Sequence, residues 1–210
     1  MLRGRRGLAY RAPTPALRRA RRTPANPMPP MPSNTPSTTA IQTERLLLRE
    51  LTPDDAGFIL ELLNEPSFID NIGDRGVRDL DGAVRYILDG PAQSYARNGY
   101  GLWRVELRDS GEVIGMCGLL RRETLPDPDL GYAFLPRHWS RGYALESGEA
   151  VLRHAREGLA LSRVLAITDP ANQPSIKVLE RLGLRFEGMV RMSEDAKELR
   201  LFSTAPAQTE

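Results

Sequence analysis

Hydrophobic residues in the first part of the chain predict one strand followed by two helices. The leucines from Leu46 to Leu48 predict a short strand, and Thr52-Pro53 with two aspartates after it predicts a helix over about 52–63. A second helix is expected over about 80–95. Gly90-Pro91 predicts a break in that helix, because proline removes one of its hydrogen bonds.

From Tyr100 the hydrophobic period changes to two, which is the spacing of a β-strand. Residues 100–107 and 112–120 are joined across Asp109-Ser110-Gly111, and this pattern predicts an antiparallel hairpin. Residues 130–135 predict a further strand, which ends at Pro136. The middle of the chain is therefore expected to form a sheet.

The last third of the chain alternates helical and strand patterns. Apolar residues at spacings of three and four mark two helices, and Pro174 and Gly183 mark the first turn and the end of the second one. The expected elements are a helix over 144–159, a strand over 164–168, a helix over 174–182, and strands over 184–191 and 198–203. Together these elements predict a single α/β domain over residues 41–204.

Length and composition are those of one globular domain. The chain has 210 residues, of which 40% are hydrophobic and 27% are charged. No stretch approaches the roughly 20 apolar residues of a membrane-spanning helix. The single cysteine, Cys117, excludes an internal disulfide and a cysteine-rich metal site, as is usual in a reducing cytosol. We therefore expect a cytoplasmic protein that does not enter membranes.

Residues 1–40 differ in composition from the rest of the chain. They hold eight arginines, eight prolines and no acidic residue, whereas the remainder carries 21 basic against 27 acidic residues. Such a segment buries too little apolar surface to offset its ordering entropy, so we expect a disordered extension there and a flexible tail at 205–210. Translation that begins at Met28 or Met31 would remove most of the extension. A targeting segment or an arm for an anionic partner is the alternative, and the lack of a following apolar run argues against secretion.

A short turn between a strand and a helix carries the most informative candidate chemistry. The segment Trp139-Ser140-Arg141-Gly142-Tyr143-Ala144 follows the strand that ends at Pro136 and leads into the long helix. Backbone N–H groups at a helix start point outward together, and small residues such as Gly142 and Ala144 let a phosphate approach them. Arg141 adds a positive charge at the rim. The pattern predicts an anion site, although such a turn can also be only a tight connection.

The same segment resembles the acetyl-coenzyme A loop of the GCN5-related N-acetyltransferases, the GNAT family. That loop reads Gln or Arg, two residues, Gly, one residue, Gly or Ala; here Trp139 takes the first place, and Gly142 and Ala144 take the other two. The form Trp-x-x-Gly-Tyr-Ala with Glu146 just beyond resembles the branch of ribosomal-protein N-terminal acetyltransferases (RimJ/RimL-like). Further segments are similar in order and spacing: Thr43 to Arg49, Glu112 to Gly115, Gly131-Tyr132, Asn172 to Ser175 and Glu180 to Gly183. The resemblance covers about residues 42–203.

The resemblance implies the GNAT fold: a central twisted mixed sheet of about seven strands, flanked by about four helices. The sheet is expected to splay between its fourth and fifth strands, at 130–135 and 163–168, where the pantetheine arm enters. The resemblance assigns cofactor contacts to Ala133, Phe134, Leu135, Trp139, Ser140, Arg141, Gly142, Tyr143, Ala144, Asn172 and Ser175. Asn172 is also a natural cap for the helix near Pro174. Acetyl-coenzyme A is the implied co-substrate, and no metal is implied.

The resemblance also implies how the acetyl group is transferred, directly and without a protein nucleophile. Many family members protonate the departing thiolate with a tyrosine, but that position holds Leu179 here. Ser175 matches a serine that is thought to serve instead in the ribosomal-protein branch, although it can equally be a first-turn serine bonded to backbone. Glu194 matches a glutamate assigned as general base, acting through water.

Other side chains are weighed beside these two. Glu123 and Asp129, near the ends of central strands, compete with Glu194 as the base. Glu146 is expected to orient the loop or the substrate amine rather than to accept a proton. Cys117 lies in the middle of a strand, where a small buried side chain is a better interpretation than an acetyl carrier.

The acceptor amine stays open. A protein N-terminus is the first candidate through the resemblance, and a polyamine, an amino sugar antibiotic or another small amine would use the same cofactor half. The acidic domain favours a cationic acceptor and argues against nucleic acid, except through the arginine-rich extension. The missing tyrosine keeps a second class open, a catalytically silent acyl-coenzyme A-binding regulatory domain. A monomer or a homodimer is expected.

Overall fold

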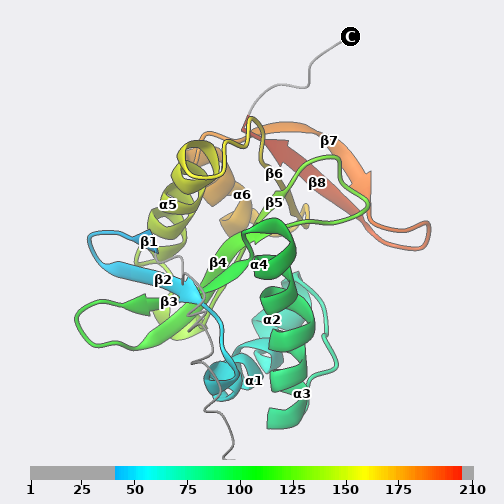
Figure 1. The fold of residues 1–210 in the computed structure, drawn as a ribbon. Coiled ribbons are helices and arrows are strands. Elements are labelled where there is room, and N and C mark those ends of the chain that lie inside the picture. The colour runs from blue at the N-terminus through cyan, green and yellow to red at the C-terminus, as the bar shows by residue number, and fades with distance from the viewer. Residues whose placement is uncertain (1–40, 205–210) are drawn as a thin grey trace, which may run out of the picture. The chain divides into compact units, whose positions relative to one another are not determined.

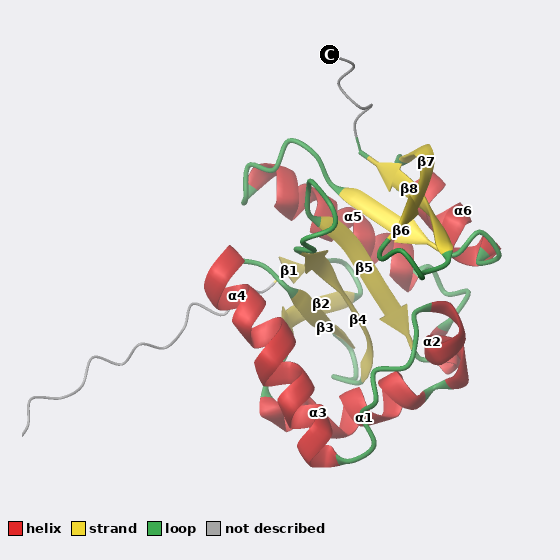
Figure 2. Ribbon diagram, turned by 90° about the vertical axis from the view of Figure 1, so that its right-hand side faces the viewer, coloured by secondary structure: helices red, strands yellow, loops and turns green. Residues whose placement is uncertain are grey.

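The structure is a computed structural model, and it describes residues 41–204. The expectations for residues 1–40 and 205–210 lie outside the described residues. The described part contains one sheet with helices packed on both of its faces (Figures 1 and 2). This arrangement confirms the α/β fold class that the sequence predicts.

The sheet is mixed and has the strand order β1-β2-β3-β4-β5-β6-β8-β7 (Figure 1). Its strands are β1 (Ile41–Gln42), β2 (Leu46–Glu50), β3 (Leu102–Leu107), β4 (Val113–Leu120), β5 (Asp129–Phe134), β6 (Leu165–Thr168), β7 (Arg185–Arg191) and β8 (Glu198–Ser203). Neighbouring strands are antiparallel except β5 and β6, which are parallel. The sheet has eight strands rather than about seven, because the two-residue β1 folds back on β2.

Two apolar cores hold the helices on the sheet. Within residues 41–204 the α-helices are α1 (Ala56–Asn64), α2 (Pro66–Asn71), α3 (Leu80–Ile87), α4 (Gln93–Asn98), α5 (Tyr143–Glu157) and α6 (Gln173–Arg181). On one face, Val151 of α5 and Leu179 of α6 pack with Trp103 of β3. On the other face, Ile59 of α1 and Ile87 of α3 join the second core. Burial of these stripes, rather than helix propensity, fixes where the helices lie.

The helical region over 80–98 refines one sequence prediction. The α-helix is interrupted around Gly90-Pro91, as expected, but the chain stays helical: residues 88–92 form a π-turn that joins α3 to α4, and Pro91 is buried within it. A wider turn relieves the clash between the proline ring and the carbonyl four residues earlier. The short helix α2 is not predicted by the sequence pattern, since Phe68 is its one buried residue and leaves no helical period to detect.

β5 and β6 pair only where β5 begins. Asp129 lies opposite Leu165, and the Leu165 N–H donates to the Pro128 carbonyl at 2.8 Å. Further along, β6 pairs with β8 on its other side, while β5 continues to Phe134 without a register partner in β6. The two strands therefore diverge, which confirms the splay expected between the strands at 130–135 and 163–168.

The main chain of β5 directs its hydrogen-bonding groups alternately to its two sides. The N–H of Leu135, just past the strand, donates to the Ile114 carbonyl next to it in β4 at 3.0 Å, so odd-numbered positions face β4. Even-numbered positions face the side on which β6 diverges. The main-chain groups of Tyr132 and Phe134 thus lie along the open edge of β5.

Candidate active site

The turn at 139–142 leads from the end of β5 into α5, as the sequence predicts. Ser140 and Gly142 both have positive φ, at 61° and 82°. The first hydrogen bond of α5 runs from the Glu146 N–H to the Gly142 carbonyl at 3.0 Å. Within the described part of the chain, none of the backbone amides from Ser140 to Leu145 donates to another protein group. These amides form a run of free donors at a helix start, which is the arrangement that binds a phosphate.

Gly142 occupies a position where the backbone conformation disfavours a side chain. Its φ of 82° lies in the left-handed region that favours glycine. A Cβ atom added there would lie 3.4 Å from Nη2 of Arg45. Arg45 also donates from Nη1 to the Arg141 carbonyl at 3.1 Å. Gly142 therefore permits the turn itself, and this guanidinium group lies close beside it.

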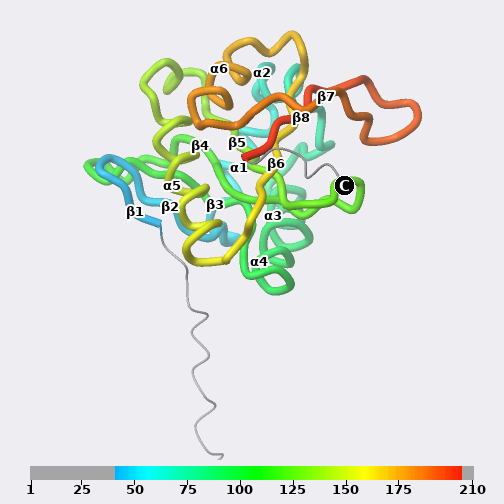
Figure 3. Tube along the Cα trace, turned by 90° about the horizontal axis from the view of Figure 1, so that it is seen from above, coloured from blue at the N-terminus to red at the C-terminus, as the bar shows by residue number. Residues whose placement is uncertain are grey.

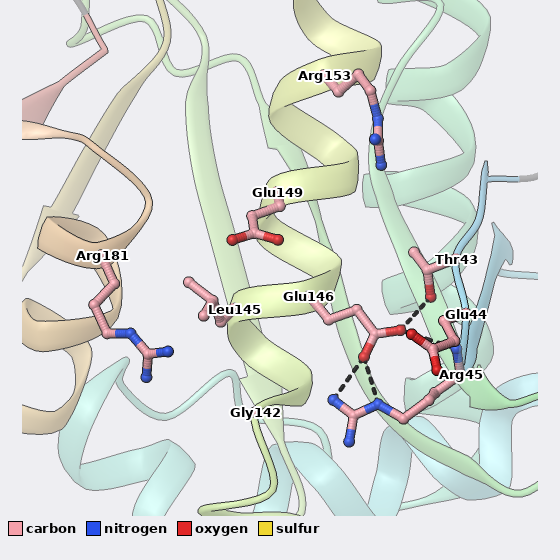
Figure 4. Close-up of a pocket in the computed structure, with 9 residues that line it drawn as sticks. All are labelled: Thr43, Glu44, Arg45, Gly142, Leu145, Glu146, Glu149, Arg153 and Arg181. Carbon is pink, nitrogen blue, oxygen red and sulfur yellow. Dashed lines mark hydrogen bonds and ion pairs between the residues drawn. The ribbon is translucent and has the colours of Figure 1, made fainter.

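Three side chains join the start of α5 to the turn between β1 and β2; we call Thr43, Arg45 and Glu146 the clamp. Glu146 Oε1 accepts hydrogen bonds from Thr43 Oγ1 at 2.6 Å and from the Arg45 N–H at 2.9 Å. Its Oε2 accepts from Arg45 Nε at 2.7 Å and lies 2.6 Å from Nη2. Figure 3 shows β1 and β2 beside α5, and Figure 4 shows the carboxylate between its two partners. The clamp thus fixes one side of the turn at 139–142.

The clamp also determines the charge state of Glu146. Burial raises the pKa of its carboxyl, but hydrogen bonds from Thr43 and Arg45 and the charge of Arg45 outweigh burial, so the pKa lies below the ordinary value. A carboxylate held ionised by several donors is a poor proton acceptor. That Glu146 orients the loop stays a prediction, and the clamp gives it a structural basis.

A pocket of about 500 Å³ opens beside the clamp (Figure 4). It is lined by Thr43, Glu44, Arg45, Gly142, Leu145, Glu146, Glu149, Arg153 and Arg181. Two of its cationic side chains come from helices, Arg153 from α5 and Arg181 from α6. The charge of the Glu146 carboxylate is neutralised by Arg45. The pocket that includes Gly142 is therefore of mixed charge.

If the turn binds acetyl-coenzyme A, as the resemblance implies, Glu146→Gln is expected to raise KM for it about 3- to 10-fold with little change in kcat. The glutamine keeps the bond from Thr43 but turns its NH2 group toward Arg45, and the Arg45 side chain is 45% exposed, so roughly 1 kcal/mol is lost. Steady-state kinetics with the cofactor varied measure the effect. Glu149→Gln, on the same helix and also beside the pocket, is the matched control and should leave KM unchanged. A fall in kcat at constant KM would assign Glu146 to the chemical step instead.

Ser175 lies in the first turn of α6, beside the diverging strands. Asn172 Oδ1 accepts from the Ser175 N–H at 3.1 Å, so Asn172 caps this helix as its sequence position indicates. The cap fixes the backbone of Ser175, and the side chain is half-buried. The cofactor contacts expected for both residues stay predictions.

Tyr132 is a candidate residue that the sequence reasoning did not single out. Its hydroxyl oxygen lies 2.9 Å from Ser175 Oγ and donates to the Ser175 carbonyl at 3.2 Å. Burial raises the pKa of Tyr132 to about 12, although the hydrogen bond with Ser175 lowers it. The sequence feature that points to Tyr132 is the strand alternation of side chains, which puts it on the same face of β5 as Leu130 and Phe134.

Trp139 takes up part of the open edge of β5. Its indole N–H donates to the Phe134 carbonyl at 2.7 Å, and the ring is 48% exposed. The Leu135 amide is bonded within the sheet to Ile114. Of the predicted segment Ala133 to Leu135, the Phe134 N–H is thus the donor that faces the diverging side.

The proposed bases lie in two different environments. Glu194 is exposed in the turn between β7 and β8, and no contact in the described residues joins it to Ser175. That turn reaches the loop after β4, where Thr124 Oγ1 lies 3.8 Å from the Met192 sulfur. Asp129 is 1% exposed and accepts from Arg122 Nε at 3.0 Å. Burial raises the pKa of Asp129 even though Arg122 lowers it.

Two further candidates have structural surroundings. Cys117 is fully buried in β4, and burial raises the pKa of its thiol to about 12, which keeps it protonated and unreactive at neutral pH. Leu179, where many family members carry a tyrosine, is 1% exposed and belongs to the core under α6. Glu123 is exposed.

Residues 41–204 contain neither a cluster of metal-binding side chains nor a membrane-spanning helix. No group of three or more His, Cys, Asp or Glu side chains is arranged to hold a metal ion there. None of the helices in this range has the length and apolar character that crossing a bilayer requires.

Comparisons with known proteins identify the family. A family model described as "Acetyltransferase (GNAT) domain" matches residues 45–185. The uncharacterized N-acetyltransferase YoaA of Bacillus subtilis is 28% identical over 72% of this chain and 85% of its own length. The solved acetyltransferase from Agrobacterium tumefaciens is 26% identical, with a TM-score of 0.69 over 80% of this chain and 94% of that one. RimL, a ribosomal L7/L12 alpha-N-protein acetyltransferase solved in complex with coenzyme A, shares the fold at 16% identity, with a TM-score of 0.70 over 81% of this chain and 100% of that one. Since the family match covers well over half of the chain and the fold agrees with it, this protein belongs to the GNAT family of acetyltransferases.

Proposed function

We propose that this protein transfers the acetyl group of acetyl-coenzyme A directly to a primary amine, with a protein N-terminus as the favoured acceptor. The observation that carries the proposal is the run of free amides from Ser140 to Leu145, which follows the end of β5 where that strand is no longer paired with β6. N–H donors and the positive end of a helix both favour a diphosphate at that place. The divergence leaves the edge of β5 open for the rest of the cofactor.

The coenzyme would bind along this path. Its diphosphate accepts hydrogen bonds from the amides at 140–145, with Arg45 and Arg141 at the rim. Its pantetheine arm runs along β5, where the Phe134 N–H can bind an amide of the arm or polarise the thioester oxygen. Asn172 contacts the arm from the side of α6.

The transfer needs a neutral amine, a stabilised oxyanion and a proton for the leaving thiolate. The amine nitrogen attacks the thioester carbon, the new C–N bond forms, and the C–S bond breaks with its electron pair on sulfur. Ser175 gives its hydroxyl proton to that sulfur. Glu194 accepts the proton of the amine through water, with Asp129 as the competing base. The proton on Glu194 returns through solvent to Ser175, so amide and thiol are the products and no protein side chain is acetylated.

The acceptor assignment has two supports. The form of the loop from Trp139 to Glu146 resembles that of ribosomal-protein N-terminal acetyltransferases, and RimL shares the fold. The chain from residue 41 onward carries 27 acidic against 21 basic residues, which attracts a cationic acceptor. A small polyamine or amino sugar is the alternative acceptor, because it also carries protonated amines.

The test is thiol release from acetyl-coenzyme A with a panel of N-terminal peptides, polyamines and amino sugars, with mass detection of each acetylated product. An enzyme of the proposed kind releases free coenzyme A with at least one amine, and the peptides give the highest kcat/KM. Binding of acetyl-coenzyme A with no product from any amine would instead indicate a silent acyl-coenzyme A-binding domain.

Two variants assign the roles. Ser175→Ala and Glu194→Gln should each lower kcat by about 100-fold or more, which is typical when a general acid or base is lost. Asp195→Asn, in the same exposed turn as Glu194, is the matched control and should stay near the wild-type rate. If Glu194→Gln resembles this control and Asp129→Asn is slow, the base is Asp129.

A further inference from the structure

The Tyr132 hydroxyl links β5 to the first turn of α6. Tyr132 projects from β5, and its hydroxyl oxygen lies within hydrogen-bond distance of both the Ser175 Oγ, at 2.9 Å, and the Ser175 carbonyl, at 3.2 Å. Both contacts are partly buried, and the residues are far apart in the chain. The contact is therefore tertiary. It involves the Ser175 hydroxyl, to which we assign the protonation of the leaving thiolate.

The positions of both hydroxyl groups are fixed by backbone contacts. Tyr132 lies opposite Cys117 in the antiparallel β4–β5 pair, so the strand holds its Cα. Ser175 is held by the Asn172 cap at the start of α6. Two groups that are fixed by their own elements meet with little loss of conformational freedom when cofactor binds.

The phenol has one proton and two acceptors within reach, so two hydrogen-bond patterns are possible. In the first, Tyr132 donates to the Ser175 carbonyl, and the Ser175 hydroxyl can donate back to the phenol oxygen. In the second, Tyr132 donates to Ser175 Oγ, and the serine proton is free to point toward the diverging strands. The second pattern prevents the serine from donating to the phenol and so leaves its proton ready to be given away.

We propose that Tyr132 is a positioning residue that directs the Ser175 hydroxyl proton toward the leaving sulfur during acetyl transfer. The inference rests on the proposed function, in which Ser175 protonates the thiolate. As the S–H bond forms and the serine O–H bond breaks, negative charge develops on Oγ. The Tyr132 hydroxyl donates its hydrogen bond to that oxygen and stabilises the charge. Ser175 then regains a proton from solvent, to which Glu194 releases the proton that it took from the amine.

The protonation state of the phenol fits this role. Burial raises the pKa of Tyr132 to about 12, so the hydroxyl is protonated throughout the neutral range and remains a donor. The Ser175 Oγ that loses its proton is stabilised by a donor that is already in place. If Tyr132 only held α6 against β5, the contact would be needed, but the phenol would not have to be the hydrogen-bond donor.

A double-mutant cycle separates these roles. Tyr132→Phe keeps the ring and removes the hydroxyl, and we expect kcat to fall about 10- to 100-fold, while KM for acetyl-coenzyme A changes by less than about 3-fold. In the Ser175→Ala background, Tyr132→Phe should change kcat by less than about 2-fold, because Tyr132 acts through Ser175. Measuring kcat and KM for the four proteins with one acceptor completes the cycle.

Controls distinguish the possible failures. Tyr86→Phe removes a largely buried phenol from α3, on the opposite face of the sheet, and should leave kcat unchanged. Multiplicative losses in the double variant, or a Tyr132→Phe rate equal to wild type, would overturn the inference while the transferase activity stands. A raised KM with a lowered melting temperature and unchanged kcat would reduce Tyr132 to a packing role. A wild-type protein that turns over no amine would overturn the proposed function itself.

Discussion

Gly142→Val is expected to weaken coenzyme A binding by about 30-fold or more. Gly142 has a φ of 82°, where a residue with a Cβ costs roughly 1–2 kcal/mol. The Cβ would lie in ordinary contact with Arg45 Nη2, at 3.4 Å, so the valine methyl groups beyond it crowd the guanidinium that donates to the Arg141 carbonyl. Valine also crowds the free amides, and each charge-assisted bond lost there is worth roughly 1.5–3 kcal/mol. A loss of about 2 kcal/mol already corresponds to the stated factor.

Isothermal titration calorimetry with coenzyme A measures this loss directly. Gly111→Val is the matched control: Gly111 has a similar φ of 73°, but it lies in the turn between β3 and β4, with no atom within 4 Å of its added Cβ. The control should lose some stability and keep its coenzyme A affinity. If the Gly142 variant and the wild type bind coenzyme A equally well, the amides at 140–145 are not the diphosphate site.

Arg104→Met is expected to cost roughly 3–5 kcal/mol of folding free energy, because it breaks a buried ion-pair network. Arg104 of β3 pairs with Asp55 and Glu106, and the exposed fractions of these side chains are 12%, 3% and 13%. Asp55 Oδ2 also accepts the Thr52 N–H at 2.9 Å at the start of α1. Without Arg104, the Asp55 carboxylate is left buried with no other cationic partner among residues 41–204, where Arg49 pairs with Glu106 at 3.4 Å.

Urea denaturation monitored by circular dichroism measures the change in the free energy of unfolding. Arg78→Met provides the matched control, because Arg78 pairs with Asp74 at 2.5 Å on the surface, where an ion pair is worth about 1 kcal/mol or less. Adding Asp55→Asn to Arg104→Met should recover part of the loss, since the amide keeps an acceptor for Thr52 and carries no charge. A loss no larger than that of Arg78→Met would show that the network is not a source of stability.

The local elements were largely predictable from the chain. The period of two over 100–120 and 130–135 predicts the hairpin of β3 and β4 and the strand β5, because one hydrophobic face must be buried. The apolar stripe over 144–159 predicts α5, and Pro174 and Gly183 mark the two ends of α6. The π-turn at Pro91 escaped prediction, because proline specifies that a normal helix hydrogen bond is lost but not how the chain compensates.

The candidate site was predictable only in part. The glycine-containing turn announces a helix start with free amides, because that property is local to the backbone. The clamp was not predictable as a contact, since Thr43 and Arg45 meet Glu146 through the sheet rather than through sequence proximity. The same is true of Tyr132 and Ser175, which lie on a strand and a helix that only the fold brings together.

Hydrophobic spacing, helix caps and the small residues of the turn were thus enough to predict most strands and helices and a turn with free amides, because each depends on neighbours within one or two turns of chain. The three-dimensional arrangement decided the rest: where β5 and β6 part, which carboxylate is neutralised by Arg45, and which hydroxyl faces Ser175. These features depend on burial and on distances between elements far apart in sequence, and packing of the whole domain sets both.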